Sequence, residues 1–221
     1  MSDSPYADNR IDYIINLLNP SKKDRVLNIG ISNIPEIEMK LEKRVKECWT
    51  MDFDKQKLER AKKYLRKTKL INADIFGDRL ASVKNNYFDK IVIVEVLEHL
   101  KDDGKAVDLV RHLLKKGGVV VAASPNKALL HLVNPVKYFE HERHYSNYEF
   151  KKLFLDRRFI IRHFNVVENW ELLVNLYVHL FFKFILKKLI PFNTFDKYSK
   201  RTYMRQNKSG LDIILKAEKT D

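Results

Sequence analysis

The sequence predicts an α/β fold in which helices cover both faces of a doubly wound, mostly parallel seven-stranded sheet. Up to about residue 125, short β-branched runs alternate with longer helical patterns, and no internal repeat interrupts them. An apolar fraction of 45% in 221 residues is enough to fill a buried core. Sheets of this kind bind ligands beyond the carboxyl ends of their strands, so functional residues are sought there.

Five short apolar runs predict strands that are buried on both faces. They cover residues 25–29, 48–52, 69–72, 89–94 and 118–124. Apolar stripes at helical spacing predict helices between them, for example the stripe of Ile11, Ile14, Ile15 and Leu18. Gly117 and Gly118 are expected to stop the last of these helices and to open the fifth strand.

The pattern changes after residue 140. We expect a helix over 147–155 and two strands over 159–167 and 211–217, which pair antiparallel at the edge of the sheet. Residues 168–208 then form a helical insertion, longer than an ordinary loop, in a domain made of residues 1–167 and 209–221.

Charge and cysteine content restrict the compartment and the partner. The formal net charge is +13, which suits an anionic partner such as a nucleic acid or a membrane surface, although lysine-rich surfaces are also common solvated shells. The lone Cys48 cannot form an intramolecular disulfide, and the first residues lack the order of a signal peptide. We therefore expect a cytoplasmic protein.

The predicted strand ends carry an ordered set of polar motifs. In chain order they read RVLNIGISN, TMDFDKQKLERAKKY, LINADIF, YFDKIVIVEVLEHL and LLKKGGVVVAASPN. This series resembles the successive motifs of class I S-adenosylmethionine-dependent methyltransferases over residues 20–167. The last two motifs are similar to those of ubiquinone-biosynthesis O-methyltransferases. The resemblance implies a Rossmann-like methyltransferase fold, S-adenosyl-L-methionine as the cofactor and S-adenosyl-L-homocysteine as its product.

The resemblance also implies a set of cofactor-binding residues. Asp52 would accept hydrogen bonds from both ribose hydroxyls, and Asp74 would accept one from the adenine amine, with Ile75 against the ring. Gly30 would let the backbone turn tightly toward the cofactor. The full predicted set is Asn28, Gly30, Asp52, Phe53, Asp74, Ile75 and Glu95.

The first motif departs from the family pattern of acid-x-Gly-x-Gly-x-Gly. This chain has Asn28 for the acid, keeps Gly30, and has Ser32 and Ile34 for the other two glycines. Because a β-branched residue tolerates positive φ poorly, we expect the loop to take another path or to approach the cofactor less closely. One alternative function is therefore a non-catalytic methyltransferase-like binding or scaffold protein, and a second is an RNA methyltransferase.

The run Glu95, Glu98 and His99 follows the fourth predicted strand. Some relatives bind a divalent metal with a Glu-x-x-Glu-His run, but the same run is common in relatives without a known metal. We therefore expect no metal here: Glu95 lines the cofactor pocket, Glu98 and His99 shape the start of the following helix, and His99 borders the substrate.

The segment YFEHERHYSNYEF resembles the turn that borders the acceptor pocket in many small-molecule methyltransferases. His141 and His144 are the candidate catalytic bases, and Arg143 and Tyr145 are candidate substrate contacts. An alternative stays open, in which these residues cap a helix that begins near Ser146.

Residues 168–208 combine an apolar helical pattern with a downstream basic run of Lys197, Lys200, Arg201, Arg205 and Lys208. The longest uncharged stretch covers 172–182, well short of the roughly 20 residues that span a bilayer. The segment is either a membrane-facing platform for a lipid-like acceptor, on the inner membrane face, or a helical cap or homodimer contact. The basic run lacks regular aromatic interleaving, so a nucleic-acid partner is not expected. Overall the sequence predicts O-methylation of a small-molecule or lipid-linked acceptor.

Overall fold

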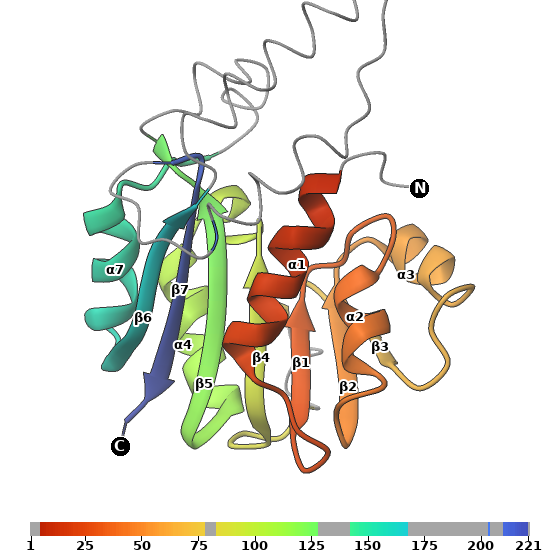
Figure 1. Cartoon of the computed structure of the whole chain (residues 1–221). Helices are drawn as coiled ribbons and strands as arrows, with labels where there is room; N and C mark the ends of the chain where they lie inside the picture. Colours follow the sequence, from red (N-terminus) through yellow and green to blue (C-terminus); the bar gives the residue numbers. More distant parts are fainter. Residues whose placement is uncertain (1–4, 78–82, 128–141, 168–202, 204–209, 221) are drawn as a thin grey trace, which may run out of the picture.

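The computed structural model describes residues 5–77, 83–127, 142–167, 203 and 210–220 (Figure 1). The helices are α1 (Pro5–Leu18), α2 (Glu36–Leu41), α3 (Lys55–Ala61), the 3₁₀-helix η2 (Leu97–His99), α4 (Asp103–Leu113) and α7 (Asn147–Leu155). The strands are β1 (Arg25–Ile29), β2 (Glu47–Asp52), β3 (Lys69–Asn72), β4 (Phe88–Val94), β5 (Leu114–Pro125), β6 (Phe159–Val167) and β7 (Asp212–Lys219).

The strands form one seven-stranded sheet in the order β3-β2-β1-β4-β5-β7-β6. β7 is antiparallel to both of its neighbours, and the other pairs are parallel. The ends of β1 to β5 and the start of β7 therefore meet along one edge, which is uppermost in Figure 1 and which we call the carboxyl edge. The predicted fold class is confirmed.

Two apolar layers hold the helices on the sheet. Along each inner strand, alternate residues point to opposite faces: on β4, Ile91 and Ile93 pack with α4 and α7, whereas Val92 packs with α1 and α2. In Figure 1, α1 and α2 lie in front of the sheet and α4 lies behind it. Burial on both faces explains why these strands read as continuous apolar runs.

The start of β5 differs from the prediction. α4 ends before the glycine pair, because Leu114 is already extended and pairs with Phe88 as the first residue of β5. The glycines lie within β5, where the register with β4 shifts and Gly117 has φ +71°. The two late strands, β6 and β7, pair antiparallel at the edge of the sheet as predicted, with β6 outermost.

The proposed insertion at 168–208 lies outside the described residues except for Tyr203. That side chain is buried and packs with Tyr13 of α1, with ring centroids 5.5 Å apart. Within the described part of the chain, no helix is long and apolar enough to cross a membrane.

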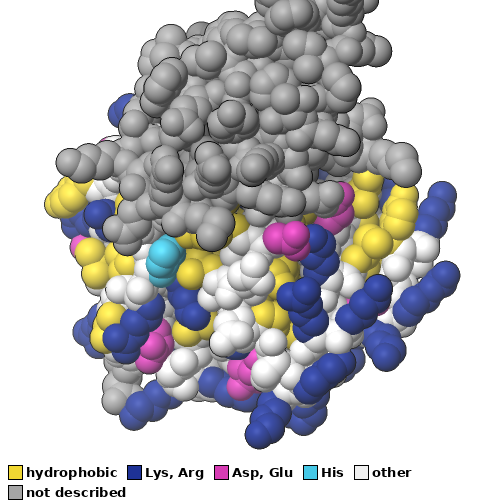
Figure 2. All heavy atoms as spheres, in the orientation of Figure 1, with side chains coloured by type: hydrophobic (Ala, Val, Ile, Leu, Met, Phe, Trp, Pro, Cys, Tyr) yellow, Lys and Arg dark blue, Asp and Glu magenta, His cyan; other side chains and the backbone are white. Residues whose placement is uncertain are grey.

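Figure 2 shows Lys and Arg side chains over the right and lower parts of the front face, around α2, α3 and the lower loops. Exposed residues there include Lys22, Lys43, Arg44, Lys62 and Arg66. Lys62 has a local acidic partner, Glu59, so this part of the surface includes an ordinary solvated ion pair.

Candidate functional site

The turn after β1 is shaped around Gly30. Its φ of +86° lies in the region that favours glycine, and its N–H donates to the carbonyl of Met51 at 2.8 Å. A Cβ on Gly30 would stand 2.4 Å from Cγ2 of Val96, so the backbone passes too close to this neighbour for any side chain. This close approach confirms the tight turn that was predicted here.

The two other motif positions do not need glycine. Neither Ser32 nor Ile34 is among the described residues with positive φ, and the Ser32 hydroxyl donates to the carbonyl of Ile34. The loop therefore accepts a β-branched residue at position 34 without left-handed backbone strain.

Asn28 forms a buried polar pair with Glu38 of α2. The Nδ2 of Asn28 donates to Oε1 of Glu38 at 2.6 Å and to the carbonyl of Gly30 at 2.7 Å. Glu38 also accepts from the Thr50 hydroxyl at 2.9 Å, and burial raises the pKa of its carboxyl although these hydrogen bonds lower it. The acid that the first motif lacks is thus present on α2.

This pairing fixes the orientation of the Asn28 amide. Because Nδ2 must face both acceptors, Oδ1 faces the other way, and it is buried without a hydrogen-bond partner among the described residues. A buried acceptor without a partner is costly, so Oδ1 is a candidate contact for a bound donor group.

Asp52 lies at the end of β2 and is almost fully buried. One carboxylate oxygen accepts from the N–H of Ile31 and the other from the N–H of Asp54, each at 2.8 Å. A carboxylate has about four acceptor positions, so roughly two remain for a ligand. Asp52 thus joins the β1 turn to the β2 turn.

Aromatic rings flank the ends of β2 and β3. Phe53 is 76% exposed, and Phe76 is 46% exposed. The exposed Asp74 accepts from the N–H of Phe76 at 2.8 Å, and Ile75 packs against the core. Large exposed apolar side chains beside a carboxylate offer a flat, partly polar surface for an aromatic ligand.

Glu95 follows β4 with φ +52°, a rare conformation for a residue other than glycine. Its carboxylate pairs with Arg10 of α1 at 2.5 Å. Arg10 also pairs with Asp212 at the start of β7, with 3.0 Å between Nε and Oδ2. The Arg10 guanidinium therefore links α1, the end of β4 and the start of β7 at the carboxyl edge.

Glu98 is buried next to this group. Ser124 at the end of β5 donates to its Oε2 at 3.1 Å, while Oε1 has no hydrogen-bond partner in the described part of the chain. Burial, aided by the Glu95 carboxylate, raises the pKa of Glu98 to about 7. His99 is exposed at the end of η2.

The segment 142–145 is attached to the start of α4. Arg143 pairs with Asp103 at 2.5 Å, and the Tyr145 hydroxyl donates to the same carboxylate at 2.7 Å and to the carbonyl of Leu97 at 3.2 Å. Burial and Asp103 raise the pKa of Tyr145 well above its usual value. These contacts are structural, and a contact of Arg143 or Tyr145 with an acceptor stays a prediction.

One of the two candidate histidines of this segment lies within the described part of the chain. His144 is half-buried between Arg143 and Tyr145, whereas His141 lies outside the described residues. Ser146 caps α7 in a reciprocal pair with Glu149, which confirms the expected helix start. The residue that caps the N-terminus of α7 is therefore Ser146.

Sequence reasoning missed Arg10, Glu38, Phe76 and Asp212 as members of this edge. A signal was available for two of them. Arg10 is four residues before Ile14 on the apolar stripe of α1, and Glu38 is three residues before the buried Leu41 on α2. A charge that continues a buried stripe indicates a partner inside the fold.

A separate cavity of about 400 Å³ lies at the opposite end of the sheet. Its lining residues are Asp108, Arg111, His112, Asp156, Arg157, Arg158 and Lys219. Arg157 donates to the carbonyls of Gly104 and Leu153, and Lys219 donates to that of Leu114. These cations satisfy backbone carbonyl groups of α4, α7 and β5, so the cavity has a structural explanation.

Comparisons with known proteins agree with this geometry. Residues 33–122 match the family model described as a methyltransferase domain. Among curated proteins, no sequence matches the chain significantly.

Solved structures share the fold at low sequence identity. The N-methyltransferase NodS from Bradyrhizobium japonicum WM9, in complex with S-adenosyl-L-homocysteine, is 16% identical with a TM-score of 0.66, covering 100% of this chain and 90% of NodS. A SAM-dependent methyltransferase from Archaeoglobus fulgidus is 17% identical with a TM-score of 0.67, covering 98% and 95%. The cyclase SpnF is 13% identical with a TM-score of 0.68, covering 97% and 81%.

The fold alone leaves the chemistry open, because SpnF shares this fold and is named for another reaction. The family match spans β2, β3 and β4, with Asp52, Asp74 and Glu95 at their ends. Residues 33–122 therefore match a methyltransferase domain, and the chain shares its fold with solved SAM-dependent methyltransferases.

Proposed function

We propose that the carboxyl edge binds S-adenosylmethionine and that the chain transfers its methyl group to oxygen on a small-molecule or lipid-linked acceptor. One observation carries the cofactor part. The ends of three neighbouring strands, β1, β2 and β3, present the Gly30 turn, the Asp52 carboxylate and the Asp74 carboxylate side by side, which supports a single extended ligand along this edge.

The described residues fit this cofactor. Gly30 leaves a cradle that a Cβ would fill, and Asn28 Oδ1 is a buried acceptor suited to an ammonium group. The two free acceptor positions on Asp52 suit the two ribose hydroxyls, and Asp74 with Phe53 and Phe76 suits an adenine ring with its amine. When bound, the cofactor supplies a methyl group on a cationic sulfur.

On the acceptor side, the chain has to orient a hydroxyl in line with that methyl group and to take up the proton that the hydroxyl loses. In-line positioning supplies much of the rate of such a displacement. We assign the proton to His144, because Arg143 and Tyr145 fix its segment through Asp103. His99, His141 and Arg143 are further proposed contacts at this side.

Replacing Asp52 by alanine should weaken binding of S-adenosylhomocysteine by about 2 kcal/mol, because a buried acceptor of two hydroxyls is lost. Titration calorimetry measures this change. The variant also loses two backbone contacts, so Asp54→Ala is the matched control: Asp54 caps α3 by accepting from Gln56 and Lys57. Equal affinities of the two variants would remove Asp52 from the cofactor site.

The acceptor class is tested with S-adenosylmethionine that carries a labelled methyl group. The probes are 3,4-dihydroxybenzoate, a polyprenylated phenol in phosphatidylglycerol liposomes, and sarcosine as an amine. Label in a phenol ether, reduced with the Asp52→Ala variant at limiting S-adenosylmethionine, would support oxygen as the acceptor atom. Label in sarcosine alone would contradict it. Preference for the liposome-bound phenol would favour the lipid-linked acceptor and the membrane-facing role expected of residues 168–208.

A further inference from the structure

Among the described residues, Arg10 pairs with two carboxylates at the carboxyl edge, one buried and one exposed. The Asp212 side chain is 9% exposed and holds Nε of Arg10, whereas the Glu95 side chain is 40% exposed and holds Nη1. With Asp212 in place, Arg10 keeps a counter-charge when Glu95 turns to another cation. The pair Arg10–Glu95 can therefore open without leaving a buried guanidinium unpaired.

This pair lies beside the Gly30 turn. Val96, the residue after Glu95, is the side chain that a Cβ on Gly30 would meet at 2.4 Å. Asn28 Oδ1, the buried acceptor without a partner, belongs to the same turn two residues before Gly30. One edge of the sheet thus offers a carboxylate, a neutral acceptor and a guanidinium.

The methionine end of the proposed cofactor carries an ammonium and a carboxylate on one carbon. The ammonium is complementary in charge to the Glu95 carboxylate, and the carboxylate is complementary to the Arg10 guanidinium. Asn28 is an additional acceptor for the ammonium. We propose that Arg10 binds this carboxylate and that the Arg10–Glu95 ion pair opens to receive the amino-acid end of the cofactor. This inference rests on the proposed function and extends the binding site to α1.

The same arrangement accounts for the unusual backbone of Glu95. Its N–H donates to the carbonyl of Ala123 on β5 at 3.0 Å, which holds the residue at positive φ. That conformation directs the residue away from the path of β4, so that the side chain meets Arg10. Strained residues of this kind concentrate at ligand sites.

The test compares ligands with and without the amino-acid group. Wild-type protein and Arg10→Gln are titrated with S-adenosylhomocysteine and with 5′-methylthioadenosine, which keeps the nucleoside but lacks the amino acid. We expect Arg10→Gln to weaken S-adenosylhomocysteine about tenfold or more and to leave 5′-methylthioadenosine within about twofold. Decarboxylated S-adenosylmethionine, which lacks only the carboxylate, should likewise be insensitive to the substitution.

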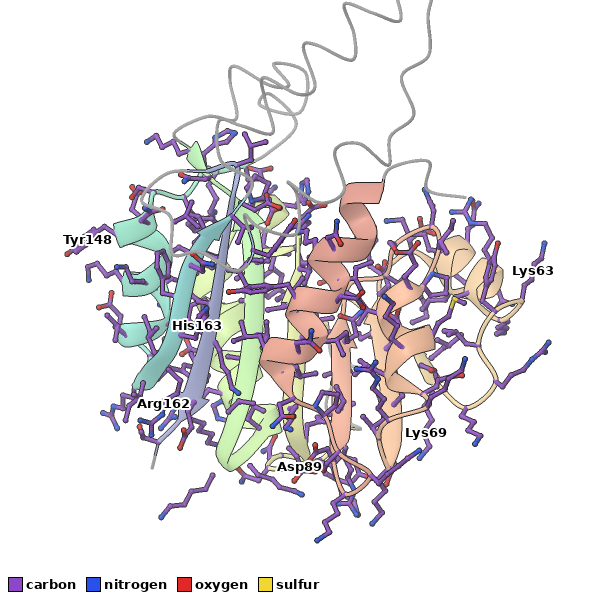
Figure 3. All side chains as sticks on the ribbon, viewed as in Figure 1. Lys63, Lys69, Asp89, Tyr148, Arg162 and His163 are labelled. Carbon is purple, nitrogen blue, oxygen red and sulfur yellow. The ribbon has the colours of Figure 1, made fainter. Side chains whose placement is uncertain are left out.

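Arg162→Gln is the matched control, because Arg162 of β6 also pairs with a glutamate, Glu218, at 2.7 Å. Figure 3 labels Arg162 near the lower end of the sheet, away from the carboxyl edge. Arg10→Lys keeps the charge and covers the case in which the glutamine variant does not fold. Equal losses for both ligands, or no loss for either, would overturn the inference. A wild-type protein that binds neither ligand would instead overturn the proposed function itself.

Discussion

Replacing Gly30 by alanine is expected to lower the free energy of unfolding by about 3 kcal/mol, because a Cβ adds both a left-handed backbone penalty and a collision. The backbone has φ +86°, and the new Cβ would stand 2.4 Å from Cγ2 of Val96. Urea denaturation measures the loss.

Gly117→Ala separates the two causes. Gly117 has φ +71° but no atom within 4 Å of the Cβ position, so this variant should lose only about 1 kcal/mol. Adding Val96→Ala to the Gly30→Ala variant should remove the collision and so recover the part of the loss of unfolding free energy that exceeds the loss of Gly117→Ala. If Gly30→Ala and Gly117→Ala lose the same free energy, the close approach to Val96 is wrong.

Replacing Asn28 by aspartate, the type of residue that the family carries there, is expected to destabilise this chain by about 2 kcal/mol near pH 8. The new carboxylate would face Oε1 of Glu38, which accepts from Asn28 Nδ2 at 2.6 Å in the native protein. The second substitution Glu38→Gln should restore most of the loss, because an amide and an acid again face each other.

The loss should depend on pH. Burial already raises the pKa of Glu38, and a second carboxylate would raise the pKa of the pair further. A folded-state pKa above the unfolded value gives stability that is present at low pH and is lost as the pH rises through it. Asn28→Asp should therefore be nearer to wild type at pH 5 than at pH 8. Full stability at pH 8, or no rescue by Glu38→Gln, would contradict the pairing.

The strands could be predicted from the sequence because each inner strand is buried on both faces, which leaves an apolar run with sharp ends. β1, β3, β6 and α7 have the predicted bounds. The start of β5 was misplaced because glycines usually end helices, whereas here Leu114 leaves the helix first by pairing with Phe88.

The places of Gly30, Asp52 and Asp74 at the carboxyl edge could also be predicted, since each lies at or just after the end of a predicted strand. A sequence shows that Ser32 and Ile34 are not glycine, but only the backbone shows that neither position has positive φ.

The hydrogen-bond and ion-pair partners of the site residues could not be predicted, because they are distant in the sequence. Glu38 is ten residues from Asn28 and belongs to another element, and Arg10 is 85 residues from Glu95. Arg143 and Tyr145 have residue types that suit an acceptor site, yet both bind Asp103, about 40 residues earlier. Local patterns identify the residue types but not the partners that decide their roles.

The central claim is that the carboxyl edge still binds the methyl donor although two motif glycines are replaced. Titration calorimetry of the wild-type protein with S-adenosylhomocysteine tests this claim most directly, with circular dichroism to show that the protein is folded. We expect saturable binding of one ligand per chain. No heat of binding at millimolar ligand, from a folded protein, would contradict the account.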